Sequence, residues 1–449
     1  MIFIYIIKVY LSCNRAAAVL QYNSILFEKD ETMTLDNIDT CKLTAVCQDV
    51  YGEAKSEQIG RFEELVKMHK DVFNTTDVEF FSSPGRIEIV GNHTDHNGGK
   101  VLCAAINVDT LASVSPRTDG VIEVKSKGYP MLRVDVAKPD FSVSEIGTST
   151  ALIKGVVDYF KRSDKKVGGF SACMTSSVPK GAGVSSSSSF ELAIAEILNV
   201  MYNGGEIDAI FKAKASQYAE NTFFGKPCGL MDQSAIALGG VNLIDFADFE
   251  NPVVEKAHWA FFDLDIYVIA TGGDHSDLTD DYAAIPHEMK EVANCFGAKL
   301  LHEISPQKWE RDKQNIVGKV SERAYLRAEH FFEENARVEN AVKAIDDKNE
   351  KAFLDIVNES GLSSRYKLQN TYSPAGKNHN LENALDRVVK IDGVVASRVH
   401  GGGFAGTILV FADKKESGVE SALNVMFGDE NVFKLAIRQS GATKLDLEK

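Results

Sequence analysis

The sequence is poor in the residues that mark several common protein classes. Its 449 residues include only 7 cysteines, 10 prolines and 2 tryptophans. The cysteines are odd in number, scattered, and never closer than 6 positions along the chain. This spacing argues against a disulfide framework and against a zinc ribbon. We therefore expect a reducing, cytoplasmic location.

Basic residues are outnumbered by acidic ones. The counts are 49 Lys and Arg against 64 Asp and Glu, so the net charge is −15. A field of this sign repels nucleic acids and anionic membranes, so we expect neither as a partner. The hydrophobic share of 44% and the charged share of 25% are typical of a globular protein and exclude wholesale disorder.

Long hydrophobic runs are also lacking. The most apolar stretch, residues 1–11, is too short to span a bilayer, contains Lys8, and has no basic region in front of it. Two interpretations of residues 1–35 remain: a disordered extension, or a start-site artefact with translation beginning at Met33.

The chain is about three times as long as a typical domain of roughly 150 residues, and we expect two domains. Short β-branched runs over 78–136 predict an antiparallel sheet, followed by a strand over 170–178. Apolar residues at helical spacing predict helices over 151–160, 190–202 and 207–224.

An acidic stretch over 245–255 marks the predicted boundary between a domain over 36–250 and a domain over 251–449. The second domain is expected to be α+β as well, with the site in a cleft between the two domains. Its predicted strands are 260–270, 407–412 and 431–438, and its predicted helices are 286–301, 321–332, 338–346, 351–360 and 381–389.

A glycine- and serine-rich loop precedes the helix over 190–202. It reads Pro-Lys-Gly-Ala-Gly-Val over 179–184 and continues with five serines, 185–189. Glycines let a backbone approach a ligand closely, and a helix N-terminus attracts anions, so the loop suits a phosphate chain. A solvated linker or an ordinary helix cap has a similar composition. The spacing is neither that of a Walker loop nor that of a dinucleotide-binding fingerprint.

Three other stretches are rich in polar groups. The loop over 91–99 could bind hydroxyls, form a plain polar turn, or ligate a metal through His93, Asp95 and His96. The stretch over 219–233 holds two carboxylates, Glu220 and Asp232, which could divide work between a metal and an acceptor hydroxyl or merely cap helices. The turn over 400–406, HGGGFAG, lacks the context of a Rossmann loop or an esterase oxyanion hole and is interpreted as a tight turn at a domain interface.

Together these four stretches resemble the signature segments of galactokinases, which are sugar kinases of the GHMP superfamily. SSPGRIEIVGNHTDHNGG, VPKGAGVSSSSSFELA, AENTFFGKPCGLMDQ and SRVHGGGFAGTILVF occur in the order found in that family. The resemblance covers roughly residues 80–410. It implies the two-domain α+β GHMP kinase fold and transfer of a phosphoryl group from ATP to the anomeric hydroxyl of galactose.

The resemblance also implies roles for individual residues. Asp232 matches the catalytic aspartate, and Arg86 matches the arginine that pairs with it and holds it ionised. Ser187 and Glu220 match the Mg²⁺ contacts, with Ser186 nearly as plausible as Ser187. The sugar contacts would be Asn92, His93, Asp95, Gly229 and Tyr282. The ATP phosphates would lie against Gly181, Ala182, Gly183, Val184, Ser185, Ser186 and Ser187.

The first motif departs from the common pattern. Many galactokinases have G-E-H-T-D-Y where this chain has Gly91-Asn92-His93-Thr94-Asp95-His96. Asn92 replaces a carboxylate that faces the sugar, which alters a site where unpaired polar groups govern selectivity. Two alternatives to a galactokinase follow: a GHMP kinase for another sugar such as N-acetylgalactosamine or galacturonate, and a non-catalytic sensor of galactose and ATP. We expect a monomer.

Overall fold

The computed structural model describes residues 39–52, 56–179, 181–272, 279–372, 380–404 and 406–447. The predicted extension over residues 1–35 and Lys180 of the glycine-rich loop lie outside these ranges. Among the described residues, none of the helices combines the length and the apolar character needed to cross a membrane.

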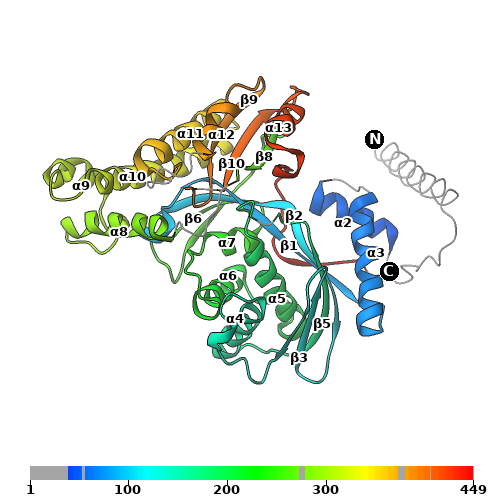
Figure 1. Cartoon of the computed structure of the whole chain (residues 1–449). Helices are drawn as coiled ribbons and strands as arrows, with labels where there is room; N and C mark the ends of the chain where they lie inside the picture. Colours follow the sequence, from blue (N-terminus) through cyan, green and yellow to red (C-terminus); the bar gives the residue numbers. More distant parts are fainter. Residues whose placement is uncertain are drawn as a thin grey trace.

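The larger sheet has eight strands (Figure 1). Its main path runs β12-β1-β2-β5-β3-β4, and β6 pairs with both β2 and β7. The predicted antiparallel pairing over 78–136 is confirmed for β1 with β2 and for β3 with β4, whereas β3 runs parallel to β5, which separates it from β2. The bounds are β1 Glu79–Val90, β2 Lys100–Pro116, β3 Val121–Ser126, β4 Met131–Asp135, β5 Phe170–Ser176, β6 Val241–Asp245, β7 Val253–Ala257 and β12 Thr443–Leu445.

Helices cover both faces of this sheet because successive side chains of a strand point to opposite sides. Phe81 and Ala112 pack in a core with α4 to α7, while their neighbours Phe80 and Leu111 pack against α2 and α3. Figure 1 shows the two groups of helices on opposite sides of the strands. The bounds are α2 Thr40–Tyr51, α3 Ser56–Phe73, α4 Ser149–Arg162, α5 Ser186–Asn203, α6 Ala209–Tyr218 and α7 Met231–Leu238.

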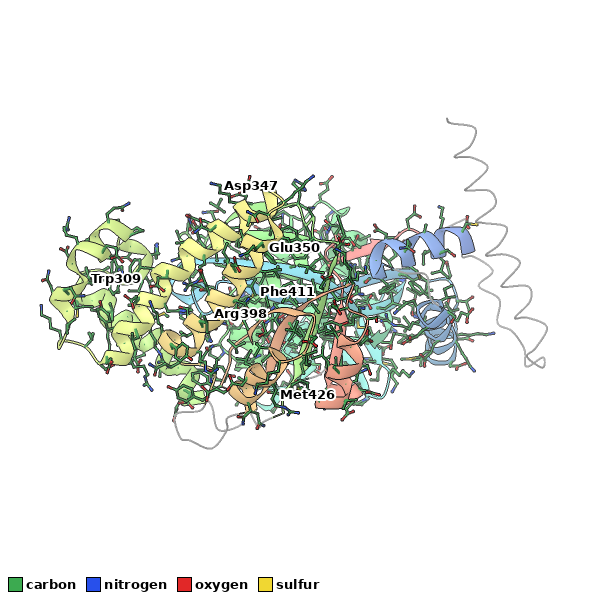
Figure 2. The ribbon with its side chains drawn as sticks, turned by 90° about the horizontal axis from the view of Figure 1, so that it is seen from above. Trp309, Asp347, Glu350, Arg398, Phe411 and Met426 are labelled. Atoms are coloured by element: carbon green, nitrogen blue, oxygen red, sulfur yellow. The ribbon has the colours of Figure 1, made fainter. Side chains whose placement is uncertain are left out.

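The second sheet has four strands in the order β11-β8-β10-β9, all antiparallel. Its strands are β8 Leu264–Ala270, β9 Val394–His400, β10 Thr407–Asp413 and β11 Val432–Leu435. The helices that follow β8 are α8 Thr279–Cys295, α9 Pro306–Asp312, α10 Glu322–Asp346, α11 Glu350–Ser363, α12 Asn380–Val388 and α13 Val419–Phe427. Figure 2 shows Trp309 of α9 at the outer end of this helical part, away from Arg398 and Phe411 of the sheet.

Short helical turns complete the chain. They are the 3-10 turns η1 Asp95–Asn97, η2 Val143–Glu145, η4 Leu301–Glu303, η5 Lys313–Ile316 and η7 Asp429–Asn431, and the π turns η3 Ala219–Phe224 and η6 Ser364–Leu368.

Several predicted helices were wrong in their bounds. Residues 322–346 form one helix, α10, where two helices over 321–332 and 338–346 were predicted. The polar stretch between the two predicted segments includes Glu334, which is fully buried within the continuous helix. Helix α5 begins at Ser186, within the serine run, rather than at residue 190. Helix α8 ends at Cys295 rather than at residue 301, and Pro286 lies inside it.

One hydrophobic core is shared by the two sheets. It joins Ile87 of β1 to Val268 of β8 and Phe411 of β10, and it includes Val338 of α10. Two strands beyond residue 250, β7 and β12, belong to the larger sheet. We therefore propose that the two domains follow the two sheets, with the chain returning to the first domain at its C-terminal end.

Candidate active site

The glycine-rich loop is anchored by its small apolar residues. Ala182 and Val184 are each 1% exposed and belong to the core shared by the two sheets. Gly181 precedes Ala182, and Gly183 lies between Ala182 and Val184. Both glycines are exposed and have φ of +75° and +66°, a region that glycine enters without strain. The loop therefore turns backbone toward solvent immediately before α5, whose first N–H groups have no partner within the helix.

Arg86 of β1 and Asp232 of α7 form an ion pair beside this loop. The two nitrogens Nε and Nη2 of Arg86 lie 2.8 and 2.7 Å from Oδ1 of Asp232. Arg86 also donates through Nη1 to the carbonyl of Gly183, and Ser185 donates its hydroxyl to Oδ2 of Asp232. Both carboxylate oxygens of Asp232 are therefore hydrogen-bonded, which fixes the orientation of the group. The side chain is still 32% exposed, so a ligand can reach it.

Glu220 and Ser187, the two residues that the resemblance implies for Mg²⁺, are in direct contact. Ser187 donates its hydroxyl to Oε1 of Glu220 at 2.8 Å, and Gln233 donates to Oε2 at 2.9 Å. Glu220 is buried and lies in the π turn η3, a conformation frequent at functional sites. In the described part of the chain, no group of three His, Cys, Asp or Glu side chains could hold a metal ion, so His93, Asp95 and His96 form no such site.

Asp95 lies against Gly229. A Cβ atom added at Gly229 would be only 2.0 Å from Oδ2 of Asp95, so only glycine leaves room for this carboxylate. Burial, aided by the negative charge of Asp232, raises the pKa of Asp95 to about 6. The structure thus brings Asp95 close to Gly229 and within electrostatic reach of Asp232.

His93 and Tyr282 contact the glycine-rich turn that follows β9. Nε2 of His93 lies 2.8 Å from the carbonyl of Gly402, and the hydroxyl of Tyr282 donates to the carbonyl of Gly403 at 2.8 Å. A carbonyl only accepts, so Nε2 of His93 carries the hydrogen and Nδ1 is left as an acceptor. Burial lowers the pKa of His93 to about 4, which keeps the ring neutral near pH 7.

Asn92 does not present its side chain to a ligand, in contrast to the prediction of a sugar contact. The residue is 0% exposed. Its amide nitrogen donates to Glu88 at 2.8 Å and to the carbonyl of Gly401 at 2.7 Å. Its amide oxygen accepts from Asn370 at 2.8 Å and from Ser364 at 3.3 Å. All four hydrogen-bonding positions of the amide are therefore used within the protein.

The HGGG turn lies at the interface between the two parts of the chain, as predicted. A Cβ added at Gly183 would be 2.7 Å from the hydroxyl oxygen of Thr407 on β10, so the glycine-rich loop touches the second sheet. His400, at the end of β9, accepts from the backbone N–H of Glu88 on β1 at 3.1 Å.

Several residues near the site were not predicted to belong to it. Lys226 lies 3.6 Å from Glu220, and Gln233 donates to the same carboxylate. Glu191 of α5 is fully buried with neither carboxylate oxygen hydrogen-bonded in the described structure, and burial together with the charge of Glu220 raises its pKa. The only signal that could have marked Glu191 was an acidic residue in the largely apolar part of α5, and Glu196 of the same helix carries the same signal.

Comparisons with known proteins agree with this geometry. A family model for the galactokinase galactose-binding signature matches residues 67–116, and a model for the GHMP kinases N-terminal domain matches residues 151–240. The galactokinase of Clostridium tetani is 31% identical over 79% of this chain and 88% of its own. The galactokinase of Lactococcus lactis subsp. lactis is 28% identical over 86% of this chain and 97% of its own.

Solved structures give the same result. The crystal structure of Lactococcus lactis galactokinase complexed with galactose superposes with a TM-score of 0.73 at 25% identity, covering 85% of this chain and 98% of that one. Mevalonate kinase of Methanococcus jannaschii, at 15% identity and a TM-score of 0.56, shares the fold. The predicted two-domain α+β GHMP kinase fold is confirmed, and the chain belongs to the galactokinase family.

Proposed function

We propose that this chain transfers the terminal phosphoryl group of ATP to the anomeric hydroxyl of galactose, which yields galactose 1-phosphate and ADP. The observation that carries the proposal is the Arg86–Asp232 ion pair, which is tied directly to the phosphate loop through Gly183 and Ser185. Membership of the galactokinase family supports it. A carboxylate placed at the edge of a phosphate-binding loop is positioned to meet an acceptor hydroxyl.

Asp232 would orient the sugar hydroxyl and accept its proton as the phosphoryl group is transferred. Arg86 stabilises the negative charge of Asp232 and, because it also contacts the loop, can balance charge that develops on the transferring group. Positioning supplies most of the rate in phosphoryl transfer, since the transition state is loose and needs little covalent assistance. Each group that fixes Asp232 should therefore affect kcat more than ATP binding.

The phosphate chain of ATP would lie against the exposed backbone of residues 181–187. Ser187 and Glu220 would hold Mg²⁺, since a hydroxyl and a carboxylate 2.8 Å apart are oxygen ligands of the kind that this ion prefers. The ion would neutralise charge on the phosphate oxygens. The sugar would be held by Asp95 and the backbone of Gly229, with His93 and Tyr282 at the edge of the site. A cytoplasmic location and a monomeric state stay predictions.

The proposal is tested by ADP release from purified protein with Mg·ATP and a panel of galactose, N-acetylgalactosamine, galacturonate, glucose and no sugar. We expect turnover with galactose, and loss of at least about a hundredfold in kcat for Asp232→Asn and Arg86→Ala with ATP affinity nearly unchanged. Turnover with only another sugar would overturn the choice of galactose. Saturable galactose binding without turnover would instead support a sensor.

A further inference from the structure

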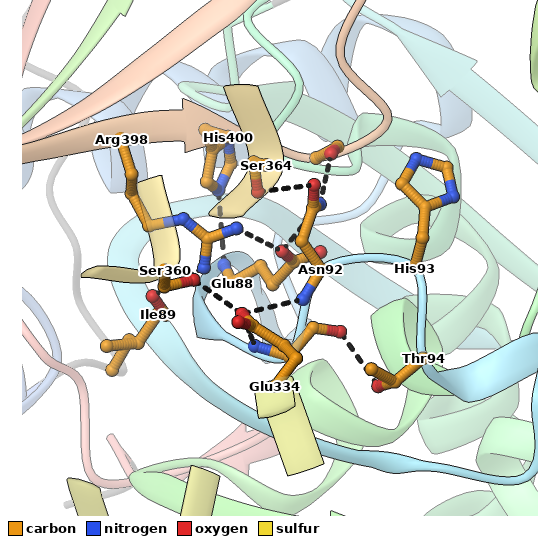
Figure 3. Close-up of polar contacts among 12 residues, drawn as sticks. Glu88, Ile89, Asn92, His93, Thr94, Glu334, Ser360, Ser364, Arg398 and His400 are labelled. Atoms are coloured by element: carbon orange, nitrogen blue, oxygen red, sulfur yellow. Dashed lines mark hydrogen bonds and ion pairs between the residues drawn. The ribbon is translucent and has the colours of Figure 1, made fainter. Parts of the chain in front are cut away.

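The loop over residues 91–97, hereafter the sugar loop, carries Asp95 and follows β1 of the larger sheet. Most of the groups that hold its first residues come from far along the chain, between residues 330 and 401 (Figure 3). We define the Asn92 network by its side chains: Glu88, Asn92, His330, Glu334, Ser360, Ser364, Asn370 and Arg398.

The backbone of the sugar loop is held by α10. Glu334 accepts from the N–H of Gly91 at 2.9 Å and from the N–H of Asn92 at 3.4 Å, and Ser360 donates to the same oxygen. Nε2 of His330 lies 2.9 Å from the carbonyl of Asn92. That carbonyl only accepts, so Nε2 carries the hydrogen of a ring whose pKa is lowered by burial.

The side chain of Asn92 makes four further contacts, and their polarity requires an amide. Its nitrogen donates to two oxygens, one of the ionised Glu88 carboxylate and one of the Gly401 carbonyl, while its oxygen faces the amide nitrogen of Asn370. Three of its four partners, all but Glu88, lie in the second half of the chain, and Glu88 is itself paired with Arg398 of β9 at 3.1 Å. Every polar atom of Asn92 therefore has a partner.

Because of these contacts, the place of the sugar loop relative to Asp232 depends on the second half of the chain. Asp232 lies on α7, and the glycine-rich loop lies just before α5. The sugar loop, in contrast, is tied to α10, to η6 and to the turn that follows β9. We infer that Asn92 is a positioning residue rather than a sugar ligand, and that its amide, with Glu334 and His330, sets Asp95 in the geometry that binds the sugar. This inference rests on the proposed function for the identity of the sugar.

The inference predicts a specific failure when the amide becomes a carboxylate. Asn92→Asp keeps the size of the side chain but removes both donors and places a second carboxylate at contact distance from Glu88. Glu88→Gln restores a donor toward position 92 and removes the like charge. Asn92→Asp should therefore displace the sugar loop, and the double variant Glu88→Gln with Asn92→Asp should restore much of its position.

The test compares wild type, Asn92→Asp, Glu88→Gln and the double variant in steady-state kinetics with galactose and ATP. We expect Asn92→Asp to raise the galactose KM at least tenfold with the ATP KM within about twofold, and the double variant to recover to within about threefold of wild type. Asp109→Asn is the matched control, since it perturbs another buried carboxylate that does not touch the sugar loop. The control should lower the melting temperature and leave the galactose KM within about twofold.

The inference is overturned if Asn92→Asp leaves the galactose KM unchanged, if Asp109→Asn raises it as much, or if the double variant is as impaired as the two single changes combined. A second measurement separates this inference from the proposed function. Amide hydrogen exchange of the ligand-free protein should show faster exchange at residues 91–97 in Asn92→Asp than in wild type, and recovery in the double variant. Unchanged exchange there would overturn the inference even if galactose proved to be the wrong sugar.

Discussion

Two buried carboxylates, Asp109 and Glu88, lie on the neighbouring strands β2 and β1 and have very different surroundings. Asp109 accepts from Tyr51 at 2.9 Å and from Arg61 at 2.7 Å, and also from Ser82, with Arg438 3.9 Å away. Glu88 has one ion-pair partner, Arg398, and one amide, that of Asn92.

The difference is reflected in the proton affinities. Burial acts to raise the pKa of Asp109, but the charges of Arg61 and Arg438 outweigh it and the net shift is downward. For Glu88, burial dominates over Arg398 and raises the pKa to about 7. A buried carboxylate whose charge is balanced by several neighbours stabilises the fold. A buried carboxylate with a single counter-charge changes its protonation and its contacts when one of its few partners is altered. We therefore expect Asp109 to govern stability and Glu88 to govern the geometry of the site.

The largest effect on this comparison is expected from Asp109→Ala. Removing the carboxylate leaves the buried Arg438 and the partly buried Arg61 without their counter-charge, which costs about 3–5 kcal/mol of unfolding free energy. The measurement is urea unfolding, together with the galactose KM, which should stay within about twofold of wild type. A large rise in that KM with little loss of stability would reverse the roles assigned to the two carboxylates.

Arg398→Met should have a smaller effect on stability, about 2–3 kcal/mol, because Glu88 can take up a proton when its counter-charge is lost. Unlike Asp109→Ala, this variant should also raise the galactose KM, since the sugar loop is tied to Glu88 through Asn92. Equal effects of the two variants on the galactose KM would remove the distinction.

The pH dependence of stability separates the two groups further. The raised pKa of Glu88 means that its contribution to stability is full below about pH 4.5 and is lost as pH rises through about 7. The pH dependence due to Asp109 has the opposite sign, because its pKa is lowered in the folded protein. Its contribution to stability is full above about pH 3.8 and is lost as the pH falls below that value. Between pH 5 and 7.5, wild type should lose roughly 2 kcal/mol relative to Glu88→Gln. The positive charges of Arg398 and Arg86 lower the pKa of Glu88, and the negative charge of Asp95 raises it. Parallel pH profiles of the two proteins would contradict a raised pKa for Glu88.

The smallest effect is expected from Tyr51→Phe. This change removes one of several hydrogen bonds to Asp109 and should cost about 1 kcal/mol with unchanged kinetics. A thermal melt measures it. A loss as large as that of Asp109→Ala would mean that the hydroxyl of Tyr51, rather than the two arginines, compensates Asp109.

Much of the candidate site could be predicted because its residues lie in short motifs. The spacing of glycines and serines before an apolar helix predicted the phosphate loop, and the motifs around Arg86, Glu220 and Asp232 predicted groups that the structure brings together. Each of these residues is identified by its immediate neighbours in the chain, so that no knowledge of the tertiary structure was required.

The Asn92 network could not be predicted in the same way. Glu334 and Asn370 lie in no motif, and their partners in the sugar loop are more than 200 residues away along the chain. The sequence shows that position 92 holds an amide, but the direction of that amide depends on which acceptors the second half of the chain places around it. Glu334 is buried because it binds the distant residue Gly91, which the sequence does not reveal. It therefore interrupted the apolar pattern of α10, and two helices were wrongly predicted there.

The central claim is that Asp232 and Arg86 direct a phosphoryl group from ATP to the anomeric hydroxyl of galactose. The most direct measurement is ³¹P and ¹³C NMR of the product formed by wild-type protein from galactose and Mg·ATP, with Asp232→Asn in parallel. We predict a single new phosphate ester coupled to the anomeric carbon, and none in the variant. An ester at another carbon, ATP hydrolysis without a sugar phosphate, or equal product from the variant would contradict the claim.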